Sequence, residues 1–120
     1  MKKLKKHYAC PVELALDLVG GKWKSVILAR IKQGPRRYSD LRREIPNIAD
    51  KELTAKLRKL EENGLIEKRS GGVDTVISVY ALTRRAEGLR PVLDGLYNWG
   101  EAVARELELS VGRGDELSGE

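Results

Sequence analysis

The chain has 120 residues, of which 41% are apolar, so it can bury one core but is too short for two domains. Charged residues make up 34% of the sequence with both signs mixed, which argues against a disordered chain, and no apolar run approaches the roughly 20 residues that span a bilayer. A single cysteine excludes an internal disulfide, and together with a single histidine it excludes a zinc cluster.

The net charge of +5 is distributed unevenly along the chain. Residues 22–69 hold 14 Lys and Arg against 7 Asp and Glu, whereas residues 83–120 hold 5 against 8. A cationic centre joined to an acidic C-terminal part is typical of a polyanion-binding face attached to a segment with another role.

The first predicted elements are a basic arm and two helices. Residues 1–9 lack the apolar stretch of a secretory signal, so we expect a flexible arm and a cytoplasmic protein. Pro11 suits a first helical turn, and apolar residues then recur at helical spacing as far as the glycine pair at 20–21. A second helix is predicted within residues 22–34, and the Gly-Pro pair at its end stops it.

The centre of the chain predicts a helix-turn-helix. Residues 36–38 indicate a brief strand, and Ser39 then caps a short helix that runs to Glu44. After a short link, a second helix covers about residues 50–63, with Gly64 as its C-cap. Two helices joined in this way form a motif whose second helix reads DNA in the major groove.

The helix at 50–63 separates an apolar stripe from a cationic face. At about 100° per residue, Leu53, Leu57 and Leu60 fall on one side, which we expect to be buried. The opposite side and its shoulder carry Lys51, Thr54, Ala55, Arg58 and Lys59. Such groups contact phosphates, guanine edges and thymine methyls. The acidic pair at 61–62 would be repelled by phosphate, so the helix is predicted to enter a groove by its N-terminal half.

A charged helix face is more often merely solvated, and the neighbouring sequence is what favours DNA here. Strands are predicted at 65–69 and 75–82, so a hairpin over 65–82 follows the helix directly. Such a hairpin is the wing of a winged helix, and Lys68 and Arg69 approach its tip, where they would contact backbone or minor groove.

A last long helix is predicted from the Thr83 cap to residue 109, with a kink at Pro91. An apolar stripe at spacings of three and four residues, as in a coiled-coil seam, is formed by Leu89, Val92, Leu96, Trp99 and Val103. Leu93 and Leu107 widen the stripe. The partner of this stripe is either the chain's own core or a second copy, and so short a chain has little other core to cover it. Residues 110–120 are predicted to be a disordered tail, which leaves 10–109 as the folded domain.

Several segments together resemble a known family. The segments are "CPVELALDLVGGKWKSVILARIKQGPRRYSDLRREIPNI", "LTAKLRKLEENGLIEKR", "YALT" and "PVLDGLYNWGE", and they extend from about Cys10 to Glu101. They resemble the HxlR-type transcriptional regulators, which are related to the MarR and ArsR groups. The resemblance implies a mainly α fold with a small β-hairpin, a winged helix-turn-helix with N- and C-terminal dimerisation helices. It also implies a homodimer that holds double-stranded DNA with its central helices and wing.

Two departures from the family pattern concern the DNA-facing elements. Ala49-Asp50 stands where the family commonly has Ser followed by Pro at the start of the recognition helix. The wing carries Gly71-Gly72 at its tip, whereas many members have a Pro-rich wing.

These observations predict a homodimeric, sequence-specific DNA-binding regulator acting on a two-fold operator. The candidate DNA contacts are Lys51, Thr54, Ala55 and Arg58 for the major groove, Ser39, Arg42, Arg43, Lys59, Arg36 and Arg37 for phosphates, and Lys68 and Arg69 for the wing. The candidate dimer contacts are Val12, Leu16, Leu89, Val92, Leu96, Trp99 and Val103. The alternative is a winged-helix protein-interaction module that offers its basic face to an acidic partner.

No enzyme is expected, because the chain has neither a nucleophile elbow nor a glycine-rich phosphate loop between a strand and a helix. No cofactor, metal or membrane partner is expected, and the sequence names no effector.

Cys10 has two interpretations. Some members of the resembled family sense oxidants or electrophiles through a cysteine in this region, which makes Cys10 a candidate sensor. The other interpretation is that Cys10 is a small buried apolar residue that packs in the fold.

Overall fold

The computed structural model describes residues 4–71 and 74–112. Its elements in chain order are α1 (Pro11–Val19), α2 (Lys24–Lys32), α3 (Tyr38–Glu44), α4 (Asp50–Glu62), β1 (Ile66–Gly71), β2 (Asp74–Leu82), the 3-10 helix η1 (Arg85–Leu89) and α5 (Arg90–Glu106). The start of the predicted arm, Gly72 of the wing tip and most of the predicted tail lie outside the described residues.

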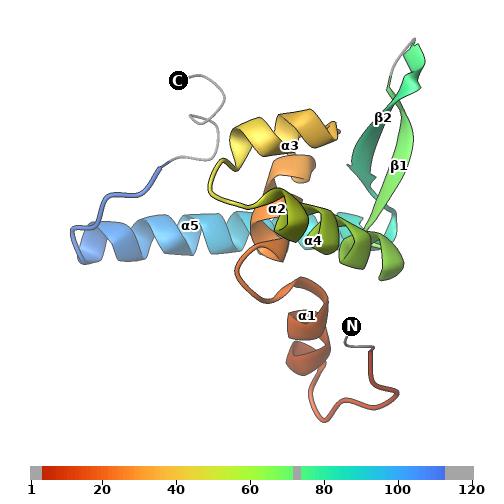
Figure 1. The fold of residues 1–120 in the computed structure, drawn as a ribbon. Helices are drawn as coiled ribbons and strands as arrows, with labels where there is room; N and C mark the ends of the chain where they lie inside the picture. The colour runs from red at the N-terminus through yellow and green to blue at the C-terminus, as the bar shows by residue number, and fades with distance from the viewer. Residues whose placement is uncertain (1–3, 72–73, 113–120) are drawn as a thin grey trace.

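The elements form a winged helix-turn-helix, as predicted. Helices α2, α3 and α4 pack together, and the β1–β2 hairpin stands beside them and projects from the body (Figure 1). Helix α5 runs across the molecule behind these helices and extends beyond them at its C-terminal end, while α1 stands away from the body (Figure 1). The helix-turn-helix with its hairpin and the two outer helices therefore form separate parts of the surface.

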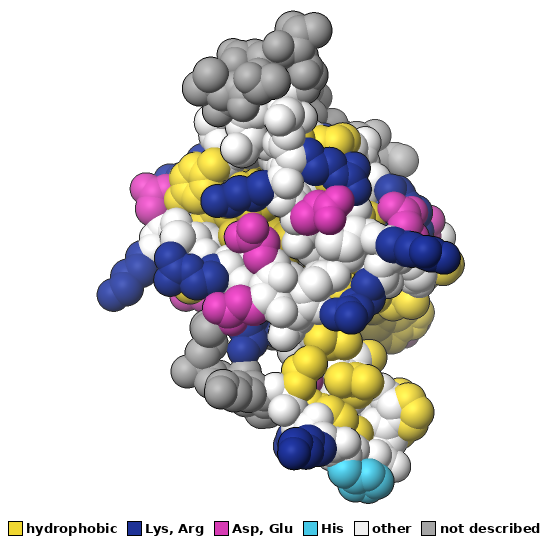
Figure 2. Space-filling view, turned by 90° about the vertical axis from the view of Figure 1, so that its right-hand side faces the viewer, with side chains coloured by type: hydrophobic (Ala, Val, Ile, Leu, Met, Phe, Trp, Pro, Cys, Tyr) yellow, Lys and Arg dark blue, Asp and Glu magenta, His cyan; other side chains and the backbone are white. Residues whose placement is uncertain are grey.

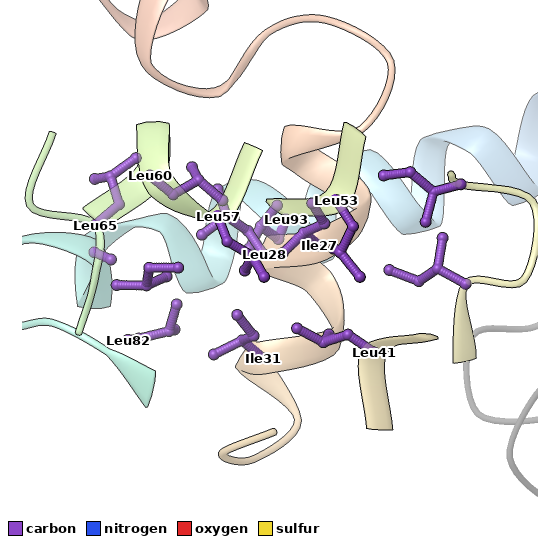
Figure 3. Packing of buried hydrophobic residues seen from close by; sticks show 14 residues of the cluster. Ile27, Leu28, Ile31, Leu41, Leu53, Leu57, Leu60, Leu65, Leu82 and Leu93 are labelled. Atoms are coloured by element: carbon purple, nitrogen blue, oxygen red, sulfur yellow. The ribbon is translucent and has the colours of Figure 1, made fainter. Parts of the chain in front are cut away.

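One hydrophobic core joins the helix-turn-helix to the hairpin and α5. The predicted stripe of α4 is buried, with exposed fractions of 0% for Leu53, 1% for Leu57 and 0% for Leu60. These leucines meet side chains from α2, α3, the base of the hairpin and α5 (Figure 3). Because each buried leucine is worth about 1.5–3 kcal/mol of transfer free energy, this stripe fixes which face of α4 turns inward.

The chain between α4 and the hairpin turns where the sequence predicted. Gly64 has a φ of +74°, a left-handed conformation that glycine adopts without strain. A side chain at this position would also strike the Arg85 guanidinium, since an added Cβ would lie 2.6 Å from its Nη1 atom. Thr83, directly after β2, closes the base of the hairpin, because its hydroxyl donates a hydrogen bond to the Gly64 carbonyl at 2.5 Å.

Two predicted helix starts are wrong. Helix α3 begins at Tyr38, so Ser39 lies inside its first turn and the N-cap residue is Arg37. The Asp40 carboxylate accepts a hydrogen bond from the Arg37 N–H at 2.9 Å. The last helix is not continuous from Thr83, because η1 precedes α5. Pro91 therefore occupies the first turn of α5, where its missing N–H has no helical partner to lose, and it begins this helix instead of kinking it.

The hairpin is antiparallel, and its register decides which wing residues share a face. Lys68 pairs with Tyr80, and the adjacent pair is Arg69 with Val79. Since successive residues of a strand point to opposite faces, Lys68 and Arg69 lie on opposite sides of the wing. The hairpin is also joined to the helix-turn-helix through a short bridge between Arg36 and Tyr80.

Candidate nucleic-acid interface

The outward face of α4 carries an open hollow, which we call the α4 hollow. The hollow measures about 420 Å³ and is lined by Asp50, Lys51, Thr54, Ala55 and Arg58. Four of these residues were predicted from helical spacing to face the major groove. Within residues 4–71 and 74–112, neither Lys51 nor Arg58 forms a hydrogen bond or an ion pair. Their charges are therefore available to an external anion.

The start of α4 is tied to α3 by a cluster of polar groups. The Tyr38 hydroxyl lies 3.0 Å from the Asp50 Oδ1 atom and 3.3 Å from the Thr54 hydroxyl. Asp50 Oδ1 also pairs with the Arg42 Nε atom at 2.6 Å, and Arg42 Nη1 donates to the Ile48 carbonyl at 2.6 Å. These contacts fix the position of the first turn of α4 on the rest of the motif.

Arg36 is held within the fold by hydrogen bonds to the chain itself. Its Nε atom donates to Glu44 at 2.9 Å, and its Nη1 atom donates to the Gly34 carbonyl at 3.0 Å. The Glu44 side chain is only 5% exposed, so the arginine neutralises a charge that would otherwise be buried alone. Arg36 is thus engaged inside the fold, and a phosphate would have to compete with Glu44 for it.

Arg37, directly before α3, and Arg43, in its last turn, are exposed on either side of Asp40. Arg43 Nη2 lies 3.1 Å from Asp40 Oδ1, and Arg37 Nε lies 3.7 Å from Oδ2. Burial raises the pKa of Asp40, but hydrogen bonds from the Arg37 N–H and Arg43, with their positive charges, lower the pKa by more. The ionised carboxylate therefore caps α3 and orients two arginines that remain open to solvent.

The two basic residues of the wing differ in their surroundings. The Lys68 ammonium lies over the Tyr80 ring, 5.8 Å from its centre. Arg69 is held within the hairpin by Glu67 at 2.6 Å and by the Leu82 carbonyl at 3.2 Å. Burial raises the pKa of the Tyr80 hydroxyl, and the charge of Glu61 adds to this shift. Lys68 is the wing cation that is less committed to internal ion pairs.

The remaining candidates are Ser39, which is exposed in the first turn of α3, and Lys59, which is half-buried on α4. Charged side chains of both signs are mixed over the face in Figure 2, whereas apolar side chains gather at the end that carries α1. On this face the charged side chains and the apolar end at α1 are therefore different regions.

The predicted dimer contacts are mostly exposed apolar side chains on α1 and α5. The exposed fractions are 61% for Val12, 59% for Leu16, 50% for Val92, 50% for Leu96 and 70% for Trp99. Leu89 and Val103 are half-buried, and Leu89 packs against the core. We call the five exposed residues together with these two the apolar surface. Leu93, predicted to widen the stripe, is buried in the chain's own core.

Cys10 is exposed immediately before α1, where its N–H donates to the Glu13 carboxylate at 3.1 Å. Its interpretation as a small buried residue is therefore wrong for the single chain.

In residues 4–71 and 74–112, no group of acidic, histidine and cysteine side chains could hold a metal ion. No helix in the described part of the chain is long and apolar enough to cross a membrane.

Sequence reasoning missed Tyr38 and Asp50 as members of the interface. An acid in the first turn of a helix inside a cationic segment was a visible signal for Asp50. No sequence pattern pairs Tyr38 with Asp50, because the contact depends on the angle between α3 and α4.

Comparisons with known proteins agree with the geometry. A family model described as HxlR-like helix-turn-helix matches residues 18–108. An uncharacterized HTH-type transcriptional regulator of Methanothermobacter thermautotrophicus is 39% identical over 104 residues, covering 87% of this chain and 79% of that protein. The uncharacterized HTH-type transcriptional regulator YkvN of Bacillus subtilis is 37% identical over 101 residues, covering 84% and 86%.

Among solved structures, the reduced form of the redox regulator HypR superposes with a TM-score of 0.74 at 34% identity, covering 82% of this chain and 98% of that one. The relatives are transcriptional regulators and not enzymes.

Proposed function

This chain belongs to the HxlR-like helix-turn-helix family and is a DNA-binding transcriptional regulator, and from that premise we propose how it holds its operator. Two copies bind a two-fold site, and in each copy the N-terminal half of α4 enters the major groove. The cytoplasm predicted from the sequence remains the expected compartment.

The observation that carries the proposal is the α4 hollow. Lys51 and Arg58 line it without an internal partner in the described residues, and Thr54 and Ala55 lie between them. Arginine recognises guanine through two parallel hydrogen bonds, and a methyl group contacts thymine, so this set of groups suits base edges. The leucine stripe on the opposite side of α4 is fully buried, which leaves this face as the one that can enter a groove.

Phosphate contacts come from the rim of the motif. Arg37 and Ser39 are exposed at the start of α3, and Arg43 is exposed in its last turn. Lys59 and Lys68 extend the cationic surface along α4 and onto the wing. Arg42 and Arg69 contribute less, because each is already engaged by a carboxylate and a carbonyl of the chain. Phosphate contacts set affinity and its dependence on salt, whereas base contacts set the sequence that is preferred.

The second copy docks on the apolar surface. Helix α1 has only nine residues and none of them is buried, and only its end packs on the core, through Leu18 and Val19. So short a helix needs packing to be stable in water, and a second copy would supply it for the exposed side chains. Trp99, at 70% exposed, would be an unusual surface residue in a monomer. At Gly95 and Gly100 no atom of the described residues lies within 4 Å of an added Cβ, which leaves space for a second backbone. A dimer would read two half-sites about one helical turn apart, or a multiple of that distance.

The test is fluorescence anisotropy with labelled genomic fragments, starting with the protein's own upstream region, across a salt series with non-specific competitor. We expect nanomolar, competitor-resistant binding to one fragment, with Arg58→Ala weakening discrimination against changed bases by about 1–3 kcal/mol. The control is Arg84→Ala, since Arg84 is an exposed arginine outside the α4 hollow.

Weak, salt-sensitive binding that is equal on all fragments, followed by a genomic selection with no preferred site, would contradict the proposal. It would favour the protein-interaction module. The regulators related to this chain favour DNA.

We also propose Cys10 as a sensing site. Its exposed thiol directly precedes α1, a helix that the dimer would need, and the related HypR is named a redox regulator. Modification of the thiol would shift α1 and weaken dimerisation or DNA binding. A thiol-alkylating agent should therefore reduce DNA binding of the wild type but leave Cys10→Ser unaffected. Unchanged binding by a chain shown to be alkylated at Cys10 would rule this out.

A further inference from the structure

The α4 hollow contains an acid as well as cations, and a DNA-facing carboxylate needs an explanation. Asp50 is the first residue of α4, and its side chain is 70% exposed. It lines the hollow together with Lys51 and Arg58, two cations that have no ion-pair partner among the described residues. A carboxylate turned toward the phosphate backbone would weaken binding to every sequence by charge repulsion.

A favourable effect on the helix dipole explains only part of this arrangement. An acid in the first turn stabilises a helix by about 0.3–1 kcal/mol, and any orientation of the side chain would provide this. Asp50, however, is held in one orientation. Its Oδ1 atom accepts a hydrogen bond from the Tyr38 hydroxyl at 3.0 Å and forms an ion pair with Arg42 Nε at 2.6 Å.

The two groups that hold Asp50 are themselves fixed. Arg42 also donates to the Ile48 carbonyl at 2.6 Å, so its guanidinium spans the link between α3 and α4. The Tyr38 hydroxyl also lies 3.3 Å from the Thr54 hydroxyl, one turn further along α4. In the described residues the carboxylate contacts Tyr38 and Arg42 through Oδ1, which leaves Oδ2 as an oriented acceptor on an exposed side chain.

The major groove offers few donors to such an acceptor. Only the N4 amine of cytosine and the N6 amine of adenine donate hydrogen bonds there. Adenine presents its N7 acceptor beside the amine, and that atom would face the carboxylate with like partial charge. Cytosine has no acceptor on its own major-groove edge, so the chemistry of Asp50 selects cytosine.

We propose that Asp50 is a specificity-determining residue that accepts a hydrogen bond from the N4 amine of one cytosine in each half-site. Tyr38 and Arg42 are positioning residues that aim the carboxylate. This inference rests on the proposed entry of α4 into the major groove.

The experiment is a selection from a randomised DNA pool with the full chain, followed by affinities for single-base variants of the selected site. The wild type should select cytosine at one position per half-site. Asp50→Asn should lose about tenfold of the discrimination for cytosine and gain tolerance for adenine, because an amide can pair with N6 and N7 of that base. Preferences at the other positions should not change.

The matched control is Glu52→Gln, which removes the same charge from the same helical turn. Glu52 pairs with Lys56 at 3.2 Å and does not line the α4 hollow, so this variant should keep the cytosine preference. A similar gain of affinity for all sequences in both variants, with the base profile unchanged, would show that Asp50 acts only through its charge and would overturn the inference.

A second variant tests the positioning role. Tyr38→Phe should weaken the preference at the cytosine position alone, whereas a purely structural role would weaken binding to all sequences alike. A wild type that selects a clear operator without this cytosine would overturn the inference and leave the proposed function intact. A wild type that selects no sequence would overturn both.

Discussion

Helices α4 and α5 carry similar apolar stripes that differ in burial. The stripe of α4 is completely buried, with Leu57 only 1% exposed, whereas Leu96 and Trp99 of α5 are 50% and 70% exposed. Both stripes follow the same helical period. The difference teaches that periodicity identifies an apolar face but does not say whether the chain itself covers it.

Within α5 the contrast is even sharper. Leu93 and Ala104 lie on one side of the helix and are buried in the chain's own core. The exposed residues Val92, Leu96 and Trp99 lie about a quarter turn away on the same helix. Helix α5 therefore has one apolar side that is buried within the chain and a second that the chain leaves exposed.

The largest effect on stability is expected from truncating a leucine of the buried α4 stripe. Leu57→Ala should lower the free energy of unfolding by about 2–5 kcal/mol, because it removes buried methyl groups and leaves a cavity. Leu96→Ala deletes the same atoms from the apolar surface and should act only where the dimer forms. Chemical denaturation at two protein concentrations separates the two, since the loss in Leu57→Ala should not depend on concentration. Equal, concentration-independent losses would mean that the single chain covers this part of α5.

The adjacent arginines Arg36 and Arg37 also differ in burial. Arg36→Ala should lower the free energy of unfolding by about 3 kcal/mol, because Glu44 is left buried without its partner. Arg37→Ala should change it by less than about 0.5 kcal/mol, since the Arg37 side chain is 49% exposed. Replacing the pair together, as Arg36→Met with Glu44→Leu, should recover most of the loss. Thermal unfolding of the three variants measures these differences, and a stable Arg36→Ala would disprove the structural role.

A smaller effect is expected on self-association. Trp99→Ala should raise the dissociation constant of the dimer about 30-fold, equivalent to about 2 kcal/mol, since exposed tryptophans that become buried dominate interfaces. Tyr97→Ala is the matched control, because Tyr97 is an exposed aromatic residue of α5 outside the apolar surface. Analytical ultracentrifugation over a concentration series gives both constants. Equal effects of the two substitutions would place the interface elsewhere.

The smallest effect concerns pH and the cap of α3. The pKa of Asp40 is lowered from its ordinary value of 3.8 in the folded chain, so its contribution is present above that value and is lost as the pH falls through the lower folded pKa. Asp40→Asn should therefore cost less than about 1 kcal/mol at pH 6, and the difference from wild type should shrink toward pH 3. Urea denaturation at these two pH values measures this difference, and one that grows on acidification would contradict the assigned direction.

The elements that the sequence predicted well depend on local rules. The boundaries of α4, its leucine stripe and the Gly64 cap follow from helical spacing and from the freedom of glycine at positive φ. The start of α5 was predicted wrongly, because the 3-10 turn before Pro91 interrupts the helix and spacing alone does not reveal such a turn.

Residues with the same sequence signal received different roles from the tertiary structure. Arg36 and Arg37 are neighbours of identical type, yet only Arg36 reaches the buried Glu44 of α3. Lys68 and Arg69 were predicted as a pair, yet the pleat of the strand puts them on opposite faces of the wing.

The amino-acid sequence by itself determined that this chain is a winged helix-turn-helix with a cationic recognition helix and an additional apolar helix at its C-terminal end. It could do so because helical periodicity, turn residues and charge distribution are local properties. The tertiary structure alone decided that Asp50 meets Tyr38 and Arg42 and that Leu96 and Trp99 remain uncovered. Those outcomes depend on the angles at which separate elements pack, and the angles follow from the whole core and not from any one segment.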